Sequence, residues 1–146
     1  MTKIIDGKAF AEGLGAKISQ SIPHFAEQTG RRPGLAVVLV GTDPASEIYV
    51  RSKGRMARKL GMESFEHILD EGVSQEELLA LVARLNADDS VDGILIQLPL
   101  PGHLDSLELV SAIDPAKDVD GLHPVSAGLL ASGLPGLVSC TPLGCL

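Results

Sequence analysis

Aromatic residues are scarce in this 146-residue sequence, which has no Trp, one Tyr and three Phe. The chain is one domain's worth of residues, long enough to bury a sizeable core, and that core must be mainly aliphatic. No apolar run approaches the roughly 20 residues that a membrane-spanning helix needs. The first ten residues also lack the apolar stretch of a secretory signal peptide. We therefore expect a cytoplasmic protein with no membrane partner.

Cysteine is also rare, and its two copies, Cys140 and Cys145, lie at the end of the sequence. No other cysteine and no nearby histidine completes a set of metal ligands, so we predict no metal site. Free thiols are the expected state in a reducing compartment. The net charge of −7 argues against nucleic acid as a partner.

Residues 34–61 organise the chain. They open with a valine-rich apolar run at 35–40, which is typical of a buried strand. Asp43 is a helix-cap residue and Pro44 is a favoured first helical position. We therefore predict a helix that begins there, runs to about residue 60 and ends at Gly61.

A helical wheel of this segment shows one apolar face, formed by Val50, Met56, Ala57 and Leu60. Tyr49 and Lys53 are four residues apart and fall in the middle of that face, where their side chains would touch. A lysine can pack its stem there while its ammonium reaches water. Alternatively, a partly buried amine loses its proton more readily than an exposed one and can carry protons. Spacing alone leaves both interpretations open.

Five of the twelve basic residues fall within nine positions of the same helix: Arg51, Lys53, Arg55, Arg58 and Lys59. Such a run is commonly a solvated helix face. In an acidic chain it is alternatively a landing site for an anionic ligand tail.

Further helices are predicted from capping and periodicity, including a short one from Asp105 to about Ile113 that Pro115 ends. Asp6 is placed to cap a helix over 8–28, with a kink or an early stop at Pro23. Its inner stripe is expected to consist of Phe10, Leu14, Ile18 and Ile22. Ser74 begins a capping-box pattern, which predicts a helix to about residue 86. The residues expected to face inward there are Leu78, Leu81, Val82 and Leu85.

Two further strands complete an alternating pattern. Residues 62–69 roughly alternate in polarity and predict a strand, at an edge of the sheet, and residues 94–96 predict a third, buried strand. The order strand, helix, strand, helix, strand indicates βαβ units with right-handed crossovers. The predicted fold class is α/β, a three-layer βαβ domain with a small, mostly parallel sheet.

Ligands of such sheets bind beyond the carboxyl ends of the strands. Gln97 interrupts the apolar run ILIQLPLP at one of these ends. A cap on nearby backbone groups and a role in a ligand site are both consistent with that position. A turn at 117–121, KDVDG, carries Asp118 and Asp120. Because aspartates in turns commonly bond their own backbone, we expect one of the two to be structural.

The last part of the sequence, from residue 125 onward, is apolar and rich in glycine. Such a terminus would expose surface that a folded domain normally covers. Thr141 and Pro142 resemble the cap and first residue of a helix that has barely begun. We expect the chain to be a truncated piece of a longer protein.

Four ordered motifs, VGTDPASEIYVRSKGRMARKLG, VDGILIQLPLP, PAKDVDGLHP and CTPLGC, resemble those of a known enzyme family. It is the family of bifunctional methylenetetrahydrofolate dehydrogenase/methenyltetrahydrofolate cyclohydrolases of the bacterial FolD type. The resemblance extends over the whole chain. It implies oxidation of methylenetetrahydrofolate with NADP and hydrolysis of the methenyl product to formyltetrahydrofolate, in a cytoplasmic homodimer.

Carried over by motif, the resemblance makes Lys53 the general acid/base, held in position by Gln97, with Tyr49 lining the pterin site beside it. Leu98 and Pro99 would shape the pocket wall. Asp120 would anchor the pterin through its ring nitrogen and amino group. The expected catalytic residues are thus Lys53, Tyr49, Gln97 and Asp120, and Leu98 and Pro99 join them in binding substrate.

The resemblance also implies a division of the chain. Residues 1–121 would form the folate-binding catalytic domain, and residues 122–146 would connect it to a Rossmann domain that binds NADP and is missing here. No cofactor-binding residue is expected in this chain, since its glycine-rich stretch does not open a strand–helix unit. Ser126 and Ser139 depart from the family pattern, which usually has Asn and Pro there. Both lie outside the expected catalytic set, so we expect them to affect the conformation of the local turn more than the chemistry.

Two other functions remain as alternatives. One is a folate-binding or interaction module without turnover. The other is a small regulatory α/β module of the response-regulator kind, in which Tyr49, Lys53 and Gln97 would have no place.

Overall fold

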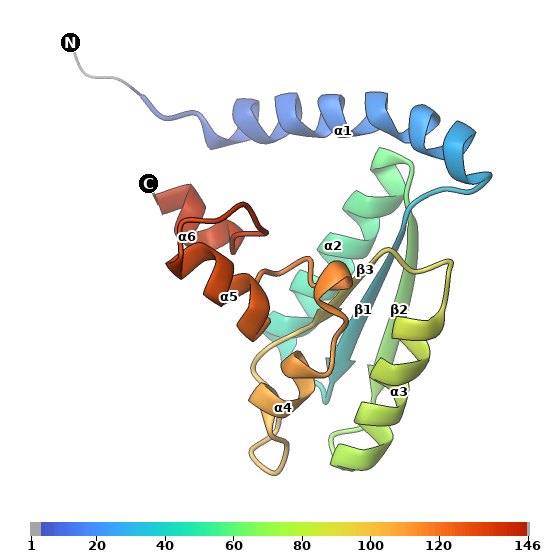
Figure 1. Ribbon diagram of the computed structural model, residues 1–146, viewed down its shortest axis with the longest axis vertical. Coiled ribbons are helices and arrows are strands. Elements are labelled where there is room, and N and C mark those ends of the chain that lie inside the picture. Colours follow the sequence, from blue (N-terminus) through green and yellow to red (C-terminus); the bar gives the residue numbers. More distant parts are fainter. Residues whose placement is uncertain (1–3, 146) are drawn as a thin grey trace.

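The computed structural model describes residues 4–145 and has an α/β fold (Figure 1). Its sheet has three parallel strands, β1 (Gly34–Val40), β2 (Glu63–Leu69) and β3 (Gly93–Ile96), in the order β2-β1-β3. Within it, Gly34 pairs with Glu63, and Leu35 pairs with both Ser64 and Gly93. The predicted parallel sheet and the edge position of the second strand are confirmed.

Helices cover both faces of the sheet, which gives the predicted three layers. One face packs on α3 (Gln75–Ala87) and α4 (Ser106–Ser111). The other face packs on α2 (Pro44–Leu60). Successive side chains of β1 point to opposite faces of the sheet and pack in both layers. The buried side chains of the two layers are almost wholly aliphatic. Full burial of each one contributes about 1.5–3 kcal/mol to folding.

The ends of α2 follow the sequence prediction. The Asp43 side chain accepts a hydrogen bond from the Ser46 main-chain N–H at 2.8 Å, and this contact lowers the pKa of that carboxyl. Gly61 ends the helix with a positive φ of 100°, which favours glycine.

The buried face of α2 differs from the wheel. Its centre is formed by small residues, Ser46, Val50, Gly54 and Ala57. Tyr49 and Lys53 are therefore not in the middle of the buried face but beside it, and Tyr49 is 61% exposed. The reason lies at Gly54, where a Cβ atom would collide with the Glu66 carboxylate of β2. This close approach turns the small residues toward the sheet and the larger ones aside.

Helix α1 (Gly7–Thr29) contradicts part of its prediction. It continues through Pro23 without an early stop, and none of its residues is buried. Phe10 is 75% and Leu14 is 49% exposed, so the expected inner stripe is wrong for its first half. The physical reason is that α1 lies across the end of α2 rather than on the sheet (Figure 1). The Ser19 hydroxyl donates to the Leu60 carbonyl at 3.2 Å at this crossing.

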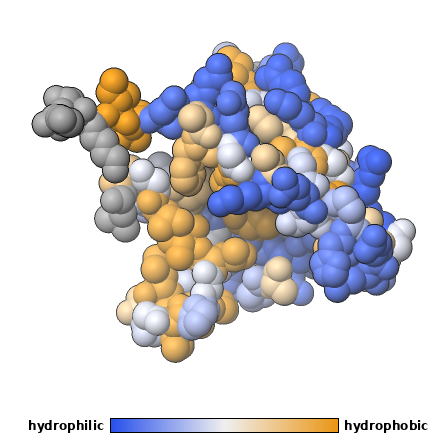
Figure 2. All heavy atoms as spheres, turned by 90° about the horizontal axis from the view of Figure 1, so that it is seen from above, coloured by the Kyte–Doolittle hydropathy of each residue, from blue (hydrophilic) through white to orange (hydrophobic). Residues whose placement is uncertain are grey.

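Two short helices end the described part of the chain, α5 (Pro124–Ala131) and α6 (Cys140–Cys145). Helix α5 has no counterpart among the predicted elements, and α6 begins slightly before the predicted Thr141 cap. Both cysteines are free and exposed, as expected. Figure 2 shows apolar atoms gathered over this end of the molecule. Among them are the exposed side chains of Leu130, Leu134, Leu137 and Leu143.

A 3₁₀ turn, η1 (Pro115–Lys117), precedes the segment that carries the two aspartates. Asp118 forms an isolated parallel bridge with Ile94, so this segment runs beside the outer edge of β3. Every helix in residues 4–145 is too short or too polar to cross a membrane.

Candidate active site

A lysine and a glutamine from separate elements meet beside the sheet. The Lys53 Nζ atom on α2 donates to the Gln97 Oε1 atom at 3.0 Å, across 44 positions of sequence. Gln97 directly follows β3, and its main-chain N–H donates to the Val38 carbonyl at 2.8 Å as the last rung of the sheet. Its Nε2 atom donates to the Leu98 carbonyl at 2.7 Å. These two side-chain partners determine which way the amide faces, with its oxygen toward the lysine.

An apolar cavity of about 530 Å³ lies between α2, the start of β1 and β3, and the segment after η1, so it borders the amino ends of these strands and not the carboxyl ends that the sequence predicted. Lys53 and Asp120 both line this cavity, and each is half-buried. Its apolar lining includes Leu35, Met56 and Leu95. The cavity thus offers an aliphatic slot with an amine and a carboxylate on its wall, which is the usual composition of a small-molecule site.

The two aspartates of the KDVDG turn have different environments. Asp118 is 1% exposed and accepts hydrogen bonds from the main-chain N–H groups of Leu122 and His123 and from the Ser126 hydroxyl. Within residues 4–145, no donor lies within hydrogen-bonding distance of the Asp120 carboxylate, although it borders the cavity. The structural aspartate of the pair is therefore Asp118, and Asp120 is available to a ligand.

The rest of the motif anchors the turn to the body of the domain. The Lys117 Nζ atom donates to three carbonyls at the end of α3, those of Leu85, Asn86 and Asp88, at 2.8–3.1 Å. Such a cation at a helix C-terminus satisfies carbonyls that have no partner within the helix. Lys117 therefore fixes the start of the turn, and together with Asp118 it positions Asp120.

His123, the histidine of the PAKDVDGLHP motif, is a structural residue. Its Nδ1 atom accepts the Val125 main-chain N–H at 3.0 Å and so caps α5. Its Nε2 atom lies 3.1 Å from the Ser111 carbonyl, which can only accept, so the proton is assigned to Nε2. Sequence reasoning lacked a signal for this role, because histidine is an uncommon cap.

Four predicted site residues do not line the cavity that Lys53 and Asp120 share, and of these Gln97 is joined to it by its hydrogen bond with Lys53. Tyr49 is mostly exposed, and its hydroxyl makes no hydrogen bond with Lys53. Leu98 and Pro99 are joined by a cis peptide bond and are both exposed. Pro99 borders a separate, polar hollow of about 340 Å³ near Asp43. The structure thus brings together Lys53, Gln97 and Asp120 but not Tyr49, Leu98 and Pro99.

The basic run on α2 is mainly a solvated face. Arg51 pairs with Glu47 at 3.0 Å and Arg58 pairs with Glu66 at 2.8 Å, both near the surface. Exposed pairs of this kind contribute little to stability.

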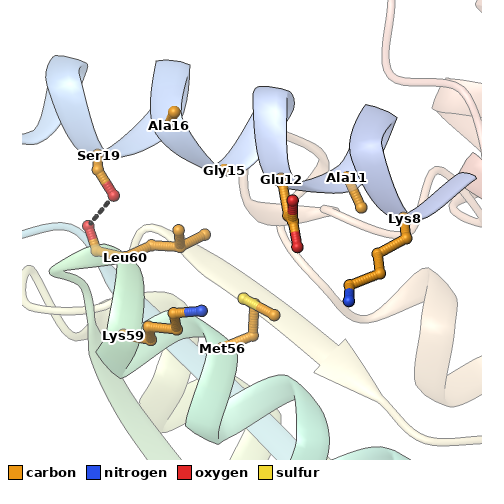
Figure 3. Close-up of a pocket in the computed structure, with 9 residues that line it drawn as sticks. All are labelled: Lys8, Ala11, Glu12, Gly15, Ala16, Ser19, Met56, Lys59 and Leu60. Carbon is orange, nitrogen blue, oxygen red and sulfur yellow. Dashed lines mark hydrogen bonds between the residues drawn. The ribbon is translucent and has the colours of Figure 1, made fainter.

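A further hollow of about 560 Å³ lies between α1 and α2 (Figure 3). Lys8 and Glu12 of α1 face Met56 and Lys59 of α2 across it. None of the residues predicted for the site lines this hollow. Among residues 4–145, no group of His, Cys, Asp or Glu side chains is arranged to hold a metal ion.

A family profile described as "Tetrahydrofolate dehydrogenase/cyclohydrolase, catalytic domain" matches residues 5–120, which contain Lys53, Gln97 and Asp120. The chain belongs to this family. Within it, the bifunctional protein FolD of Sphingopyxis alaskensis is 62% identical over 144 residues, covering 99% of this chain and 48% of that protein. FolD of Nitrobacter hamburgensis is 61% identical over 143 residues, covering 98% and 49%.

Solved structures of the tetrahydrofolate dehydrogenase/cyclohydrolase family share the fold. The bifunctional FolD enzyme of Campylobacter jejuni superposes with a TM-score of 0.90 at 44% identity, covering 95% of this chain and 49% of that one. The Trypanosoma brucei enzyme, described as complexed with NADP cofactor and inhibitor, gives a TM-score of 0.90 at 36% identity, covering 96% and 48%. The chain spans about half the length of the relatives that it matches.

Proposed function

We propose that this chain forms the folate-binding, catalytic part of an enzyme that interconverts one-carbon derivatives of tetrahydrofolate. The reactions are oxidation of methylenetetrahydrofolate with NADP and hydrolysis of methenyltetrahydrofolate to formyltetrahydrofolate. The observation that carries the proposal is the Lys53–Gln97 hydrogen bond beside a cavity that Asp120 also lines. The matched relatives, named as dehydrogenase/cyclohydrolases, support the reaction class.

The hydrolysis step is the one for which this chain offers groups. Water attacks the cationic methenyl carbon, and a proton must leave that water as the C–O bond forms. A neutral Lys53 amine accepts this proton, and Gln97 holds the amine by its Oε1 atom. The adduct then collapses: its hydroxyl loses the second proton to solvent as the C=O bond forms, one C–N bond breaks, and the lysine can return its proton to the nitrogen that leaves.

Asp120 would hold the substrate rather than react with it. A carboxylate accepts two neighbouring N–H donors, such as the ring N–H and amino group of a pterin. The aliphatic lining of the cavity suits the flat faces of a ring system whose polar edge is held by the carboxylate. Tyr49, Leu98 and Pro99 stay proposed contacts for parts of the substrate that extend beyond the cavity.

The residues that the structure describes do not fit NADP. After Gly121 the described chain forms α5 and α6, and no strand there leads into a glycine-rich turn and a helix that would cradle a pyrophosphate. We therefore derive no hydride step from these residues. Residues 1–121 are proposed as the folate-binding domain and residues 122–146 as a connection to the NADP-binding part of a longer protein. A homodimer and a cytoplasmic location for that protein stay predictions.

A chimera tests the proposal. In it, this chain replaces the matched residues of the Sphingopyxis alaskensis relative, and methenyltetrahydrofolate hydrolysis is followed optically. Tetrahydrofolate binding to the 146-residue chain is measured separately by calorimetry. We expect both binding and hydrolysis. Binding without hydrolysis by a folded chimera would support a folate-binding module without turnover, and a chain that does not bind folate would overturn the proposal.

A further inference from the structure

The segment that carries Asp120 is tied down by the buried carboxylate of Asp118. The Asp118 Oδ2 atom accepts the His123 main-chain N–H at 2.9 Å and the Ser126 hydroxyl at 2.7 Å, and Oδ1 accepts the Leu122 N–H at 3.3 Å. Ser126 is 4% exposed on the first turn of α5. One carboxylate therefore joins the start of the turn, its end and the following helix.

Both chain neighbours of Asp120 also contact other segments, although Val119 is 44% exposed. Val119 lies directly against Gly93 of β3, where a Cβ atom would collide with its Cγ1 atom. Gly121 has a positive φ of 67°, and a Cβ atom there would lie 2.9 Å from the Ser139 nitrogen. The chain before α6 thus covers the turn from outside. Within residues 118–121, Asp120 is therefore the residue whose polar side chain borders the cavity without a hydrogen-bond partner.

We propose that Asp118 and Ser126 are positioning residues, which act through the turn to place the Asp120 carboxylate for a ligand that offers two adjacent N–H donors. The proposal rests on the proposed function, because it deepens the role of that carboxylate. Neither residue touches the ligand, since both are buried behind the turn. A bidentate, charge-assisted contact needs its acceptor within about 0.5 Å of the productive position, so the support of the turn sets affinity.

Ser126→Ala is the first test, because it removes one donor from Asp118 and changes little volume. Binding of tetrahydrofolate to the 146-residue chain is measured by calorimetry, together with the melting temperature. We expect the Kd to rise about five- to tenfold, less than the roughly 10- to 150-fold for direct loss of a hydrogen bond to a charged group, because Ser126 acts on the ligand through the turn. Ser126→Thr keeps the hydroxyl and should restore most of the affinity. Ser132→Ala, at the other end of α5 and exposed, is the matched control and should bind as the parent does.

A double-mutant cycle separates positioning from general loosening of the fold. If Ser126 acts through Asp120, the effect of Ser126→Ala should vanish in an Asp120→Ala background, because there is no carboxylate left to place. An equal loss of affinity in both backgrounds, or no loss in either, would overturn the proposal.

Amide hydrogen exchange gives a readout that needs no variant. We expect the Leu122 and His123 amides, which donate to Asp118, to be protected already in the free chain. Exchange at the rate of exposed amides, slowed only by tetrahydrofolate, would mean that the ligand orders the turn, and the positioning role would be wrong.

A protected turn in a chain that does not bind tetrahydrofolate would instead overturn the proposed function, and the positioning of Asp120 for that ligand would fall with it. Binding that Ser126→Ala leaves unchanged overturns only the present proposal.

Discussion

Lys53 and Gln97 form one hydrogen-bonded unit, in which a helix residue and a strand-end residue 44 positions apart meet at 3.0 Å. The glutamine amide is held on its other side by the Leu98 carbonyl. The lysine amine therefore has a defined place beside the apolar cavity, and this arrangement underlies the first prediction.

Lys53→Met should abolish most methenyltetrahydrofolate hydrolysis in the chimera while the fold survives. Methionine keeps the length and apolar packing of the stem but has no nitrogen that titrates. Loss of a general base typically lowers a rate about 10²–10⁴-fold, so we expect a fall of at least about 100-fold. Folate affinity and melting temperature should change far less. Lys53→Arg should not restore the rate, because a guanidinium stays protonated. A folded methionine variant that hydrolyses at the parent rate would make Lys53 a packing residue.

Asp120→Asn should weaken folate binding more than it slows any chemical step. The amide keeps one acceptor but loses the charge, and it presents a donor to a donor of the ligand. A loss of roughly 1.5–3 kcal/mol is expected, which corresponds to about a 10- to 150-fold rise in Kd. Calorimetry with tetrahydrofolate measures it, and Asp89→Asn, exposed on another turn, serves as the control. An unchanged dissociation constant would remove Asp120 from the site.

Gly93→Ala should destabilise the chain by pushing Val119 away from β3. A methyl group there collides with the Val119 Cγ1 atom, and because Val119 is 44% exposed and has room to shift, we expect a loss near the lower end of the roughly 1–3 kcal/mol range for overpacked cores, about 1 kcal/mol. Urea unfolding of the variant measures the loss. Adding Val119→Ala makes room for the new methyl, so the double variant should recover most of the stability. If Val119→Ala gives no recovery in the Gly93→Ala background, the two residues are not in energetic contact.

NADP should not bind appreciably to the 146-residue chain. Pyrophosphate binding needs main-chain N–H groups gathered at a glycine-rich turn and a helix N-terminus, and the described residues after Gly121 offer no strand–turn–helix unit. Equilibrium titration with NADP tests the expectation, with tetrahydrofolate as the positive control. Micromolar NADP binding would show that the nucleotide site lies within this chain.

Asp92 should contribute stability that is lost in acid. Its carboxylate accepts two hydrogen bonds from Arg31, at 2.6 and 2.8 Å, and one from the Gly34 main-chain N–H at 2.8 Å. The bonds from Arg31, followed by that from Gly34, hold the pKa of Asp92 below its ordinary value of 3.8. A group whose pKa is lower in the folded state stabilises the fold above the unfolded-state pKa and loses that effect as pH falls through the folded-state value.

Asp92→Asn should therefore unfold at lower urea than the parent at neutral pH, and the difference should shrink well below pH 3.8. Glu76→Gln, an exposed residue in the first turn of α3, is the control. A difference between Asp92→Asn and the parent that stays constant from neutral to strongly acidic pH would contradict this linkage.

Local chemistry allowed much of the fold to be predicted. The boundaries of α2 and α3 follow from Asp43, Gly61 and the capping box at Ser74, because caps satisfy main-chain groups within a few residues. The strands follow from short apolar runs, and their parallel order follows from the helices between them. Helix α5 could not be predicted in this way, because its cap is His123 and histidine is not one of the usual cap residues.

The secondary-structure elements and the α/β class could be inferred from the sequence, and motif resemblance added the family and the candidate residues Lys53, Gln97 and Asp120. Which residues border one cavity, and which face of each helix is buried, became evident in the folded chain. The close approach of Gly54 to β2 is accompanied by an outward-facing Tyr49, and Phe10 is exposed because α1 lies across α2. The structure also distinguishes Asp118, which is buried and hydrogen-bonded, from Asp120, which borders the cavity. The physical reason is that helix rotation and side-chain partners depend on contacts between segments far apart in sequence, and periodicity within one segment does not specify them.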